Sequence, residues 1–304
     1  MEKVSIIIPA YNKAELTIRT IESVLKQTYK NIEIIVIDDG STDHTQQALA
    51  VYEGKIRYIY KDNGGACSAR NLGIKLATGE FIGILDCDDL YCERKIELSM
   101  KYLTDHPEFD IVHTAAYFID GEDKIIGQYS HPKSRKQGVI ANRLIMGNFI
   151  CNSTVIIRKK CFDEVGVFDE TFFTPADWDM WIRLAEKFKV GYLDIPLSKY
   201  RVTDNYIFSK LELSREEEFK VIKKFVERNP MSRGLLKHRA LSNLHLRYAQ
   251  CYLLKDNVQQ LKLDFILSLK ENPFNMKALL FLCGYIFNRT QLRAILEKRI
   301  LRYS

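Results

Sequence analysis

Short runs of apolar, largely β-branched residues alternate with longer amphipathic segments in the first part of the chain. The runs are typical of buried strands, and the spacing of Leu16, Ile21 and Leu25 is typical of an amphipathic helix. The pattern predicts strands at Val4–Pro9, Ile32–Ile37, Ile56–Tyr60 and Phe81–Leu85, and helices at Ala14–Gln27, Thr42–Tyr52 and Ala66–Ala77. Apolar strands that alternate with helices indicate a mostly parallel sheet covered on both faces.

The pattern changes twice in the rest of the chain. Residues 110–202 mix strand and helix signals, and from about Leu211 only helical patterns follow. The elements expected in the mixed region are strands at Asp110–Phe118, Val155–Arg158 and Val190–Asp194, a hairpin turn at Asp120–Asp123 and a helix at Asp177–Phe188. We therefore expect an α/β domain over residues 1–210 and an all-helical region over residues 211–304.

Composition and charge narrow the class of protein. The chain has 304 residues, of which 46% are apolar and 28% charged, which excludes a disordered, collagen-like or coiled-coil protein. The seven cysteines form no CxxC pair, and the N-terminus leads into a strand pattern without a signal peptide, so we expect a cytoplasmic protein. Residues 1–209 carry 26 basic and 30 acidic side chains, whereas residues 210–304 carry 19 and 9. The basic tail suggests a partner of its own.

Polar loops follow the predicted strands, at the edge where parallel sheets bind ligands. They are Pro9–Asn12 after the first strand, Asp38-Asp39 after the second and Asp86-Cys87-Asp88-Asp89 after the fourth. The Asp38-Asp39 pair is either a turn with a helix cap or a carboxylate that accepts a hydrogen bond from a base or ribose. The carboxylates of Asp86 and Asp88 repel each other unless a cation is shared, and their oxygens suit Mg²⁺ or Mn²⁺.

Two helix starts add further candidate chemistry. Gly64-Gly65 opens the helix that carries Arg70, and it forms either an ordinary capped loop or an anion site, since a helix N-terminus favours negative charge. Asp177 begins a later helix and is either an N-cap or a general base. The neighbouring Trp178 is typical of core packing.

Three segments together resemble the inverting glycosyltransferases of family 2, which have the GT-A fold. They are residues 5–45 with IDDGSTDHT, residues 63–89 from NGGACSARN to LDCDD, and residues 176–184, ADWDMWIRL. The resemblance covers about residues 3–205, and its motifs stand in the family's order and spacing. It implies a Rossmann-like, mostly parallel sheet flanked by helices, with a nucleotide-sugar half at about 1–110, an acceptor half at about 111–210 and a helical appendage.

The resemblance also implies roles for individual residues. The donor is expected to contact the loop with Pro9, with Tyr11 stacked on the base and Asp39 accepting a hydrogen bond from it. Arg70 is expected to contact the base or the diphosphate of the donor. Asp86 is expected near the ribose and the metal, and Asp88 is expected to bind the Mn²⁺ or Mg²⁺ ion. Asp177 is the expected catalytic base. Trp178 and Asp179 are expected to make further contacts with the substrate.

Two departures from the family pattern keep an alternative open. Ala176 stands where relatives have Glu, and Thr203 stands where many have the His of a YRxH motif. They motivate the hypothesis of a catalytically inactive sugar-nucleotide-binding or scaffold subunit of a polysaccharide-assembly complex. The retained acidic residues favour an active, metal-dependent enzyme instead. That enzyme transfers a sugar from a nucleoside-diphosphate sugar, with UDP as the default, to a hydroxyl of a glycan or lipid-linked glycan.

The basic tail has three interpretations. It is a helical appendage packed on the catalytic domain, a nucleic-acid binder, or a segment that binds an anionic membrane at its inner face. The apolar segment 274–286 and the basic amphipathic segment Arg289–Arg302 favour peripheral membrane binding as the sharper hypothesis. Nucleic acid is disfavoured because no recognisable nucleic-acid module accompanies the charge.

Overall fold

The computed structural model describes residues 1–129, 137–202 and 210–300. The chain forms two compact units. Unit 1 comprises residues 1–141 and 149–201, and unit 2 comprises residues 142–148 and 202–304. The chain therefore leaves unit 1 at residue 201, whereas the sequence places the boundary near residue 210.

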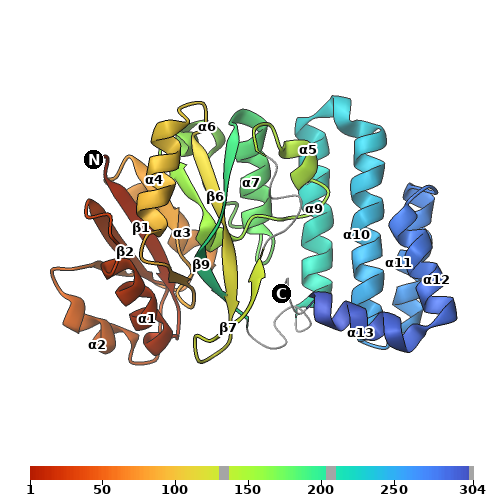
Figure 1. Ribbon diagram of the computed structural model, residues 1–304, viewed down its shortest axis with the longest axis horizontal. Helices are drawn as coiled ribbons and strands as arrows, with labels where there is room; N and C mark the ends of the chain where they lie inside the picture. Colours follow the sequence, from red (N-terminus) through yellow and green to blue (C-terminus); the bar gives the residue numbers. More distant parts are fainter. Residues whose placement is uncertain (130–136, 203–209, 301–304) are drawn as a thin grey trace. The chain divides into compact units, whose positions relative to one another are not determined.

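Unit 1 is built around one mixed β-sheet (Figure 1). Its strands among the described residues are β1 (Val4–Ala10), β2 (Ile32–Asp38), β3 (Arg57–Tyr60), β4 (Phe81–Ile84), β5 (Leu90–Tyr91), β6 (Ile111–Ile119), β7 (Ile125–Tyr129), β8 (Ile156–Arg158) and β9 (Val190–Arg201). They lie in the order β3-β2-β1-β4-β8-β6-β9-β5, and β7 pairs with β6. The first four strands in this order are parallel, but β8 is antiparallel to both of its neighbours. The sheet is thus less uniformly parallel than the apolar runs suggest.

The central strands of the parallel half are buried on both faces, whereas the edge strand β3 is partly exposed, and β1 shows why the centre is buried. Its alternate residues Val4, Ile6 and Ile8 pack in a cluster with α1 (Ala14–Leu25) and α4 (Lys95–Asp105). The intervening Ile7 lies against Gly73 of α3 (Gly65–Leu76), on the other face. A Cβ at Gly73 would lie 2.3 Å from the Ile7 side chain, so this close approach of helix and sheet requires glycine.

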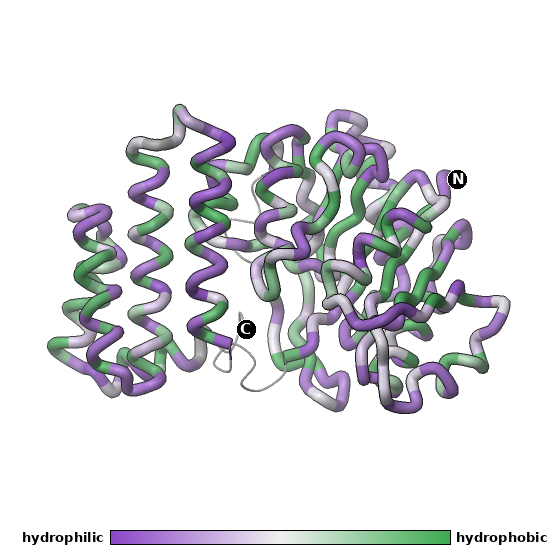
Figure 2. The backbone as a smooth tube through the Cα atoms, turned by 180° about the vertical axis from the view of Figure 1, so that it is seen from behind, coloured by the Kyte–Doolittle hydropathy of each residue, from purple (hydrophilic) through white to green (hydrophobic). Residues whose placement is uncertain are grey.

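The remaining elements of unit 1 are shorter or lie near the site. They are α2 (Thr45–Leu49), α6 (Cys161–Val165), α7 (Ala176–Lys187) and the 3-10 turns η1 (Ala50–Tyr52) and η2 (Asn152–Thr154). Figure 2 shows hydrophobic residues concentrated along the strands and hydrophilic residues over most of the loops.

Unit 2 is helical. Its described elements are α9 (Leu211–Arg228), η3 (Pro230–Arg233), α10 (Leu235–Leu254), α11 (Val258–Glu271), α12 (Met276–Phe287) and α13 (Arg289–Ile300), and the short α5 (Ala141–Leu144) spans the start of its first segment. Buried Asp264 of α11 binds Arg215 of α9 at 2.9 Å and His245 of α10 at 2.6 Å, which ties three helices together. None of the helices described here is long and apolar enough to cross a membrane.

One buried cation in unit 1 links stability to pH. The Nζ atom of Lys95, fully buried at the start of α4, donates to the Thr154 carbonyl at 2.6 Å and to Ser99 Oγ at 3.1 Å. Burial lowers the pKa of Lys95 from its ordinary 10.5 to about 7. Above pH 7 the unfolded chain therefore binds this proton while the folded chain releases it.

We predict that the free energy of unfolding rises with pH between about 7 and 10 through Lys95. The slope is on the order of 1 kcal/mol per pH unit, because the unfolded state holds the extra proton in this window. Lys95→Met should flatten the pH profile of the melting temperature, whatever its effect on absolute stability. The exposed Lys101 of the same helix provides the control, and Lys101→Met should keep the slope. An unchanged slope in Lys95→Met would contradict the prediction.

Candidate active site

The site lies where the carboxyl ends of β1, β2, β3 and β4 meet, and its loops are fixed to one another. Asn12, in the loop after β1, adopts a φ of 51° and donates its backbone N–H to Ser41 Oγ at 3.0 Å. Its side-chain oxygen accepts hydrogen bonds from the N–H groups of Thr42 at 2.8 Å and Asp43 at 3.2 Å. The loops after β1 and β2 therefore form one rigid wall, from which Tyr11 extends with 48% of its surface exposed.

The two carboxylates of the Asp38-Asp39 pair have different functions. Asp38 is buried and accepts hydrogen bonds from the Ser41 N–H at 2.8 Å and the Tyr58 hydroxyl at 2.5 Å. These contacts close the turn after β2 and attach it to β3. Asp38 is thus the structural member of the pair, as its turn interpretation predicts.

Asp39 binds the start of α3. Its carboxylate accepts hydrogen bonds from the N–H groups of Gly64 at 3.0 Å and Gly65 at 2.7 Å, and from Lys61 Nζ at 2.6 Å. Gly65 has a φ of +87°, which glycine adopts at low cost and which directs its N–H to Asp39. The anion at this helix N-terminus is therefore the Asp39 carboxylate of the protein itself. Gly64-Gly65, the candidate anion site, and Asp39, the candidate contact to the base, thus bind each other.

Arg70 and Asp86 form the centre of the site. Arg70 Nη2 lies 2.7 Å from Asp86 Oδ1, which also accepts a hydrogen bond from Asn152 Nδ2 at 2.9 Å. The Arg70 guanidinium stacks over the ring of Phe168, 5.5 Å from its centroid. Burial disfavours its charge, but the charge of Asp86 outweighs this and raises the pKa of Arg70. Asp86 Oδ2 accepts no hydrogen bond from the described residues.

Asp88 faces a lysine from the loop after β1. Lys13 Nζ lies 2.5 Å from Asp88 Oδ2, and both side chains are partly exposed. Burial lowers the pKa of Lys13, but the neighbouring Asp88 charge more than compensates, so the pKa is raised overall. Asp88 Oδ1 accepts no hydrogen bond within the described part of the chain. Asp86 and Asp88 thus each have one carboxylate oxygen that no described residue contacts.

Asp89, the third carboxylate of this loop, is structural. It is buried and accepts hydrogen bonds from Ser153 Oγ at 2.5 Å and from the Arg201 N–H at 2.8 Å. Burial, followed by the charges of Asp88 and Asp86, raises the pKa of Asp89 well above its ordinary value. It fixes the acidic loop to η2 and to the end of β9.

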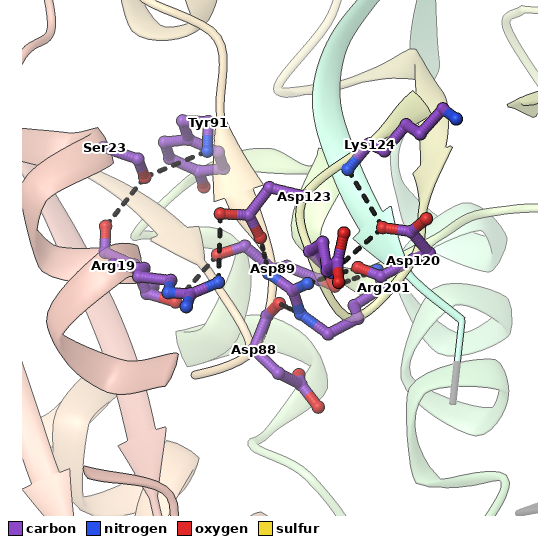
Figure 3. A network of polar contacts seen from close by, with 11 residues as sticks. Arg19, Ser23, Asp88, Asp89, Tyr91, Asp120, Asp123, Lys124 and Arg201 are labelled. Atoms are coloured by element: carbon purple, nitrogen blue, oxygen red, sulfur yellow. Dashed lines mark hydrogen bonds and ion pairs between the residues drawn. The ribbon is translucent and has the colours of Figure 1, made fainter. Parts of the chain in front are cut away.

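Arg201, the last residue of β9, holds three segments together (Figure 3). Its Nε donates to the Asp88 carbonyl at 2.8 Å, and its Nη1 donates to the Asp120 carbonyl in the turn between β6 and β7. Its Nη2 pairs with Asp123, which also pairs with Arg19 of α1 at 3.3 Å. The backbone that carries Asp88 is therefore held from β9, α1 and this turn at once.

Asp177 lies in the first turn of α7, where the helix dipole stabilises a carboxylate. Its Oδ1 accepts a hydrogen bond from the Trp178 N–H at 2.7 Å. Its charge acts on Arg70 and on the thiols of Cys67 and Cys151. Besides Asp86, which Arg70 binds, the charge of the distant Asp177 also raises the pKa of Arg70.

Three residues expected to contact substrate are buried instead. Pro9 is buried within β1, two residues after Ile7, which is the last β1 residue that pairs with β4. Trp178 is packed in the core. Asp179 is buried and binds Arg183 at 2.7 Å, and Arg183 in turn donates to the carbonyls of Val165 and Val167. These three side chains are thus buried in this structure, and Thr203 lies outside the described residues.

The structure adds residues for which the sequence predicts no role in the site. They are Lys13 beside Asp88, Lys61 beside Asp39, Asn152 beside Asp86, and Arg201. Lys13 directly follows the Pro9–Asn12 loop, and Arg201 lies in the segment compared with the YRxH motif, so their positions in the sequence could have indicated a role in the site. Asn152 comes from a 3-10 turn without any motif, and only the fold brings it to Asp86.

Comparison with known proteins identifies the family. The model of Glycosyl transferase family 2 matches residues 5–166, more than half of the chain. An uncharacterized glycosyltransferase of Rickettsia felis is 39% identical over 203 residues, which are 66% of this chain and 33% of that protein. The chain thus corresponds to about a third of the length of that relative.

A second relative agrees with this assignment, and a solved structure shares the fold. The UDP-Glc:alpha-D-GlcNAc-diphosphoundecaprenol beta-1,3-glucosyltransferase WfgD of Escherichia coli is 30% identical over 234 residues, 76% of this chain and 88% of that protein. The mannosyltransferase PcManGT of Pyrobaculum calidifontis, solved with GDP-Man and Mn²⁺, has a TM-score of 0.64 at 16% identity, over 99% of this chain and 85% of that one. The chain therefore belongs to glycosyl transferase family 2, with the GT-A fold and a C-terminal helical region.

Proposed function

We propose that the protein is a metal-dependent, inverting glycosyltransferase. It moves a sugar from a nucleoside-diphosphate sugar to a hydroxyl of a glycan or lipid-linked glycan. The observation that carries this proposal is the position of Arg70, which binds Asp86 directly and interacts electrostatically with Asp177. The charges of a donor-side carboxylate and of the candidate base thus act on one cation.

UDP is the proposed nucleotide, because the name of the Escherichia coli relative specifies UDP-Glc. Tyr11 is half exposed and is proposed to stack on the base. The Asp39 carboxylate accepts three hydrogen bonds, which leaves about one of its roughly four acceptor positions for a base N–H. Arg70 is proposed to contact the diphosphate, since a guanidinium suits phosphate oxygens.

Asp86 and Asp88 are the proposed metal ligands. Each has a carboxylate oxygen that no described residue occupies, and such oxygens suit Mg²⁺ or Mn²⁺. No group of three or more acidic, His or Cys side chains in the described residues is arranged to hold an ion, so further ligands would come from the substrate phosphates or water. The chemistry supplied by a bound ion is stabilisation of the charge on the departing diphosphate.

Asp177 is the proposed general base. The acceptor oxygen forms a bond to the anomeric carbon as the bond from that carbon to the diphosphate oxygen breaks. Asp177 takes the proton that the acceptor hydroxyl loses, and the diphosphate leaves with the bonding electron pair. One displacement of this kind inverts the configuration. Arg201 and Asn152 touch no reacting atom in this scheme and serve to position Asp88 and Asp86.

A donor screen tests the proposal. We expect a UDP-sugar, with Mn²⁺ present, to raise the melting temperature more than the matching GDP- and dTDP-sugars do, because a ligand of the folded state stabilises it. Free UDP release, measured with the donor that binds best, should follow when an acceptor glycan is added. Binding without hydrolysis or transfer to any acceptor would favour the inactive scaffold subunit. No donor-dependent shift at all would contradict both interpretations.

A further inference from the structure

Unit 2 carries an apolar stripe on α12 that its own fold leaves exposed. The inner face of the helix packs through Ala278 and Phe281, and the Phe281 ring lies 6.0 Å from that of Phe265 in α11. The opposite face carries exposed apolar side chains at helical spacing: Met276, Leu279, Leu280, Cys283, Ile286 and Phe287. We call these six residues the α12 stripe. Phe287 exposes 85% of its surface and Leu280 exposes 67%, so the stripe is open to solvent.

The exposed lysines of α11 and α12 are unpaired. Lys277 lies beside the α12 stripe in the helical repeat, and the neighbouring helix α11 exposes Lys262 and Lys270. None of these three lysines has an ion pair within the described residues.

The acidic side chains of the same segment are already engaged. Asp264 binds Arg215 and His245, Glu271 binds His238, and Glu297 binds Arg293. The segment therefore presents apolar surface and uncompensated positive charge together. Figure 2 shows the hydrophobic colour along much of α12.

We propose that the α12 stripe binds the surface of an anionic lipid bilayer. An interfacial helix buries its apolar side chains at the level of the headgroups, while lysines beside it are attracted to anionic lipids. This combination matches Leu280 and Phe287 together with Lys262, Lys270 and Lys277. The inference rests on unit 2 alone and does not depend on the donor or metal.

A second copy of the chain fits this surface less well. Two copies of the α12 stripe would bring their unpaired lysines close to one another, and lysine is depleted from the cores of protein interfaces. An anionic lipid surface supplies the opposite charge to Lys277 beside the stripe and attracts the exposed lysines of α11. The basic residues Lys298, Arg299 and Arg302 lie outside the part of the chain whose side chains are described and take no part in the proposal.

Flotation with vesicles tests the proposal on the full chain. The protein should float with vesicles that contain phosphatidylglycerol, and much less with vesicles of phosphatidylcholine alone, and high salt should reduce binding. The double variant Leu280→Asp, Phe287→Asp should lower the partition coefficient about tenfold or more. Replacing Lys262, Lys270 and Lys277 with Glu should also lower binding. A control variant that leaves unit 2 unchanged should bind vesicles as well as the unaltered protein.

That control is Val51→Asp, which changes an equally exposed valine of η1 in unit 1. Melting temperatures and circular dichroism establish that all variants fold. The proposal is wrong if the unaltered protein does not float with anionic vesicles, or if the α12 double variant floats as well as the control. It is also wrong if light scattering shows that this variant only converts a dimer to a monomer. Donor-induced thermal shifts, measured in parallel, report on the transferase proposal separately.

Discussion

Asp177→Asn is expected to lower kcat about 10²–10⁴-fold, the range that general-base catalysis typically contributes. The substitution keeps the shape and the hydrogen-bonding oxygen of the side chain but removes the group that accepts the proton. Because Asp177 is proposed to touch the acceptor rather than the nucleotide, the Kd of the donor should stay within about threefold, which is less than 1 kcal/mol. Initial rates of transfer and calorimetric titration with the donor measure the two quantities.

Asp163→Asn provides the matched control for this variant. Asp163 also lies in the first turn of a helix of unit 1, α6, and its side chain is exposed. It should retain normal turnover. Near-normal turnover in Asp177→Asn would refute the assignment of the base, whereas a parallel loss of donor affinity would place Asp177 on the donor side instead.

Asp88→Ala is expected to weaken metal-dependent donor binding by about 100-fold or more. A metal ligand that meets the charge of a diphosphate contributes several kcal/mol, and each 1.4 kcal/mol corresponds to a factor of ten. The loss should appear only when Mn²⁺ is present, because binding of the base and ribose does not use Asp88 in the proposed scheme. Titrations with UDP-sugar in Mn²⁺ and in EDTA separate the two contributions.

Asp105→Ala is a suitable control for Asp88→Ala. Asp105 pairs with Lys101 on the surface of α4, where it has no contact with the site. Its removal should leave donor binding intact. Equal donor affinity of Asp88→Ala and the unaltered protein in Mn²⁺ would exclude Asp88 as a metal ligand. A loss that persists in EDTA would point to a collapsed loop rather than a lost ligand.

The parallel half of the fold could be predicted because its strands are buried on both faces. Such strands are mostly apolar, so β1, β2 and β4 stand out as short runs, each followed by a polar loop. This pattern also placed the acidic loops at the carboxyl ends of β2 and β4. The second half was harder: β9 extends to Arg201, seven residues beyond the predicted strand end, and α4 at Lys95–Asp105 was not predicted.

The contacts of the site could not be predicted because they depend on pairing between distant segments. Asp39 and Gly65 were each expected to bind a ligand, but their spacing in the sequence does not reveal that they bind each other. Trp178 and Asp179 follow the candidate base directly, yet the turn of α7 directs their side chains into the core. Sequence motifs therefore identified the residue types of the site, while the fold decided which of them are exposed.

The hydrogen bonds of Arg201 also affect the order in which parts of unit 1 can fold during synthesis. The Asp88 carbonyl that this side chain holds lies 113 residues earlier in the chain, and the Asp120 carbonyl lies 81 residues earlier. During synthesis the acidic loop leaves the ribosome long before its anchor exists, and contacts between such distant residues form late. A nascent chain that ends before β9 would hold the nucleotide-side motifs without a finished catalytic centre, so activity should arise only when the whole of unit 1 has been made.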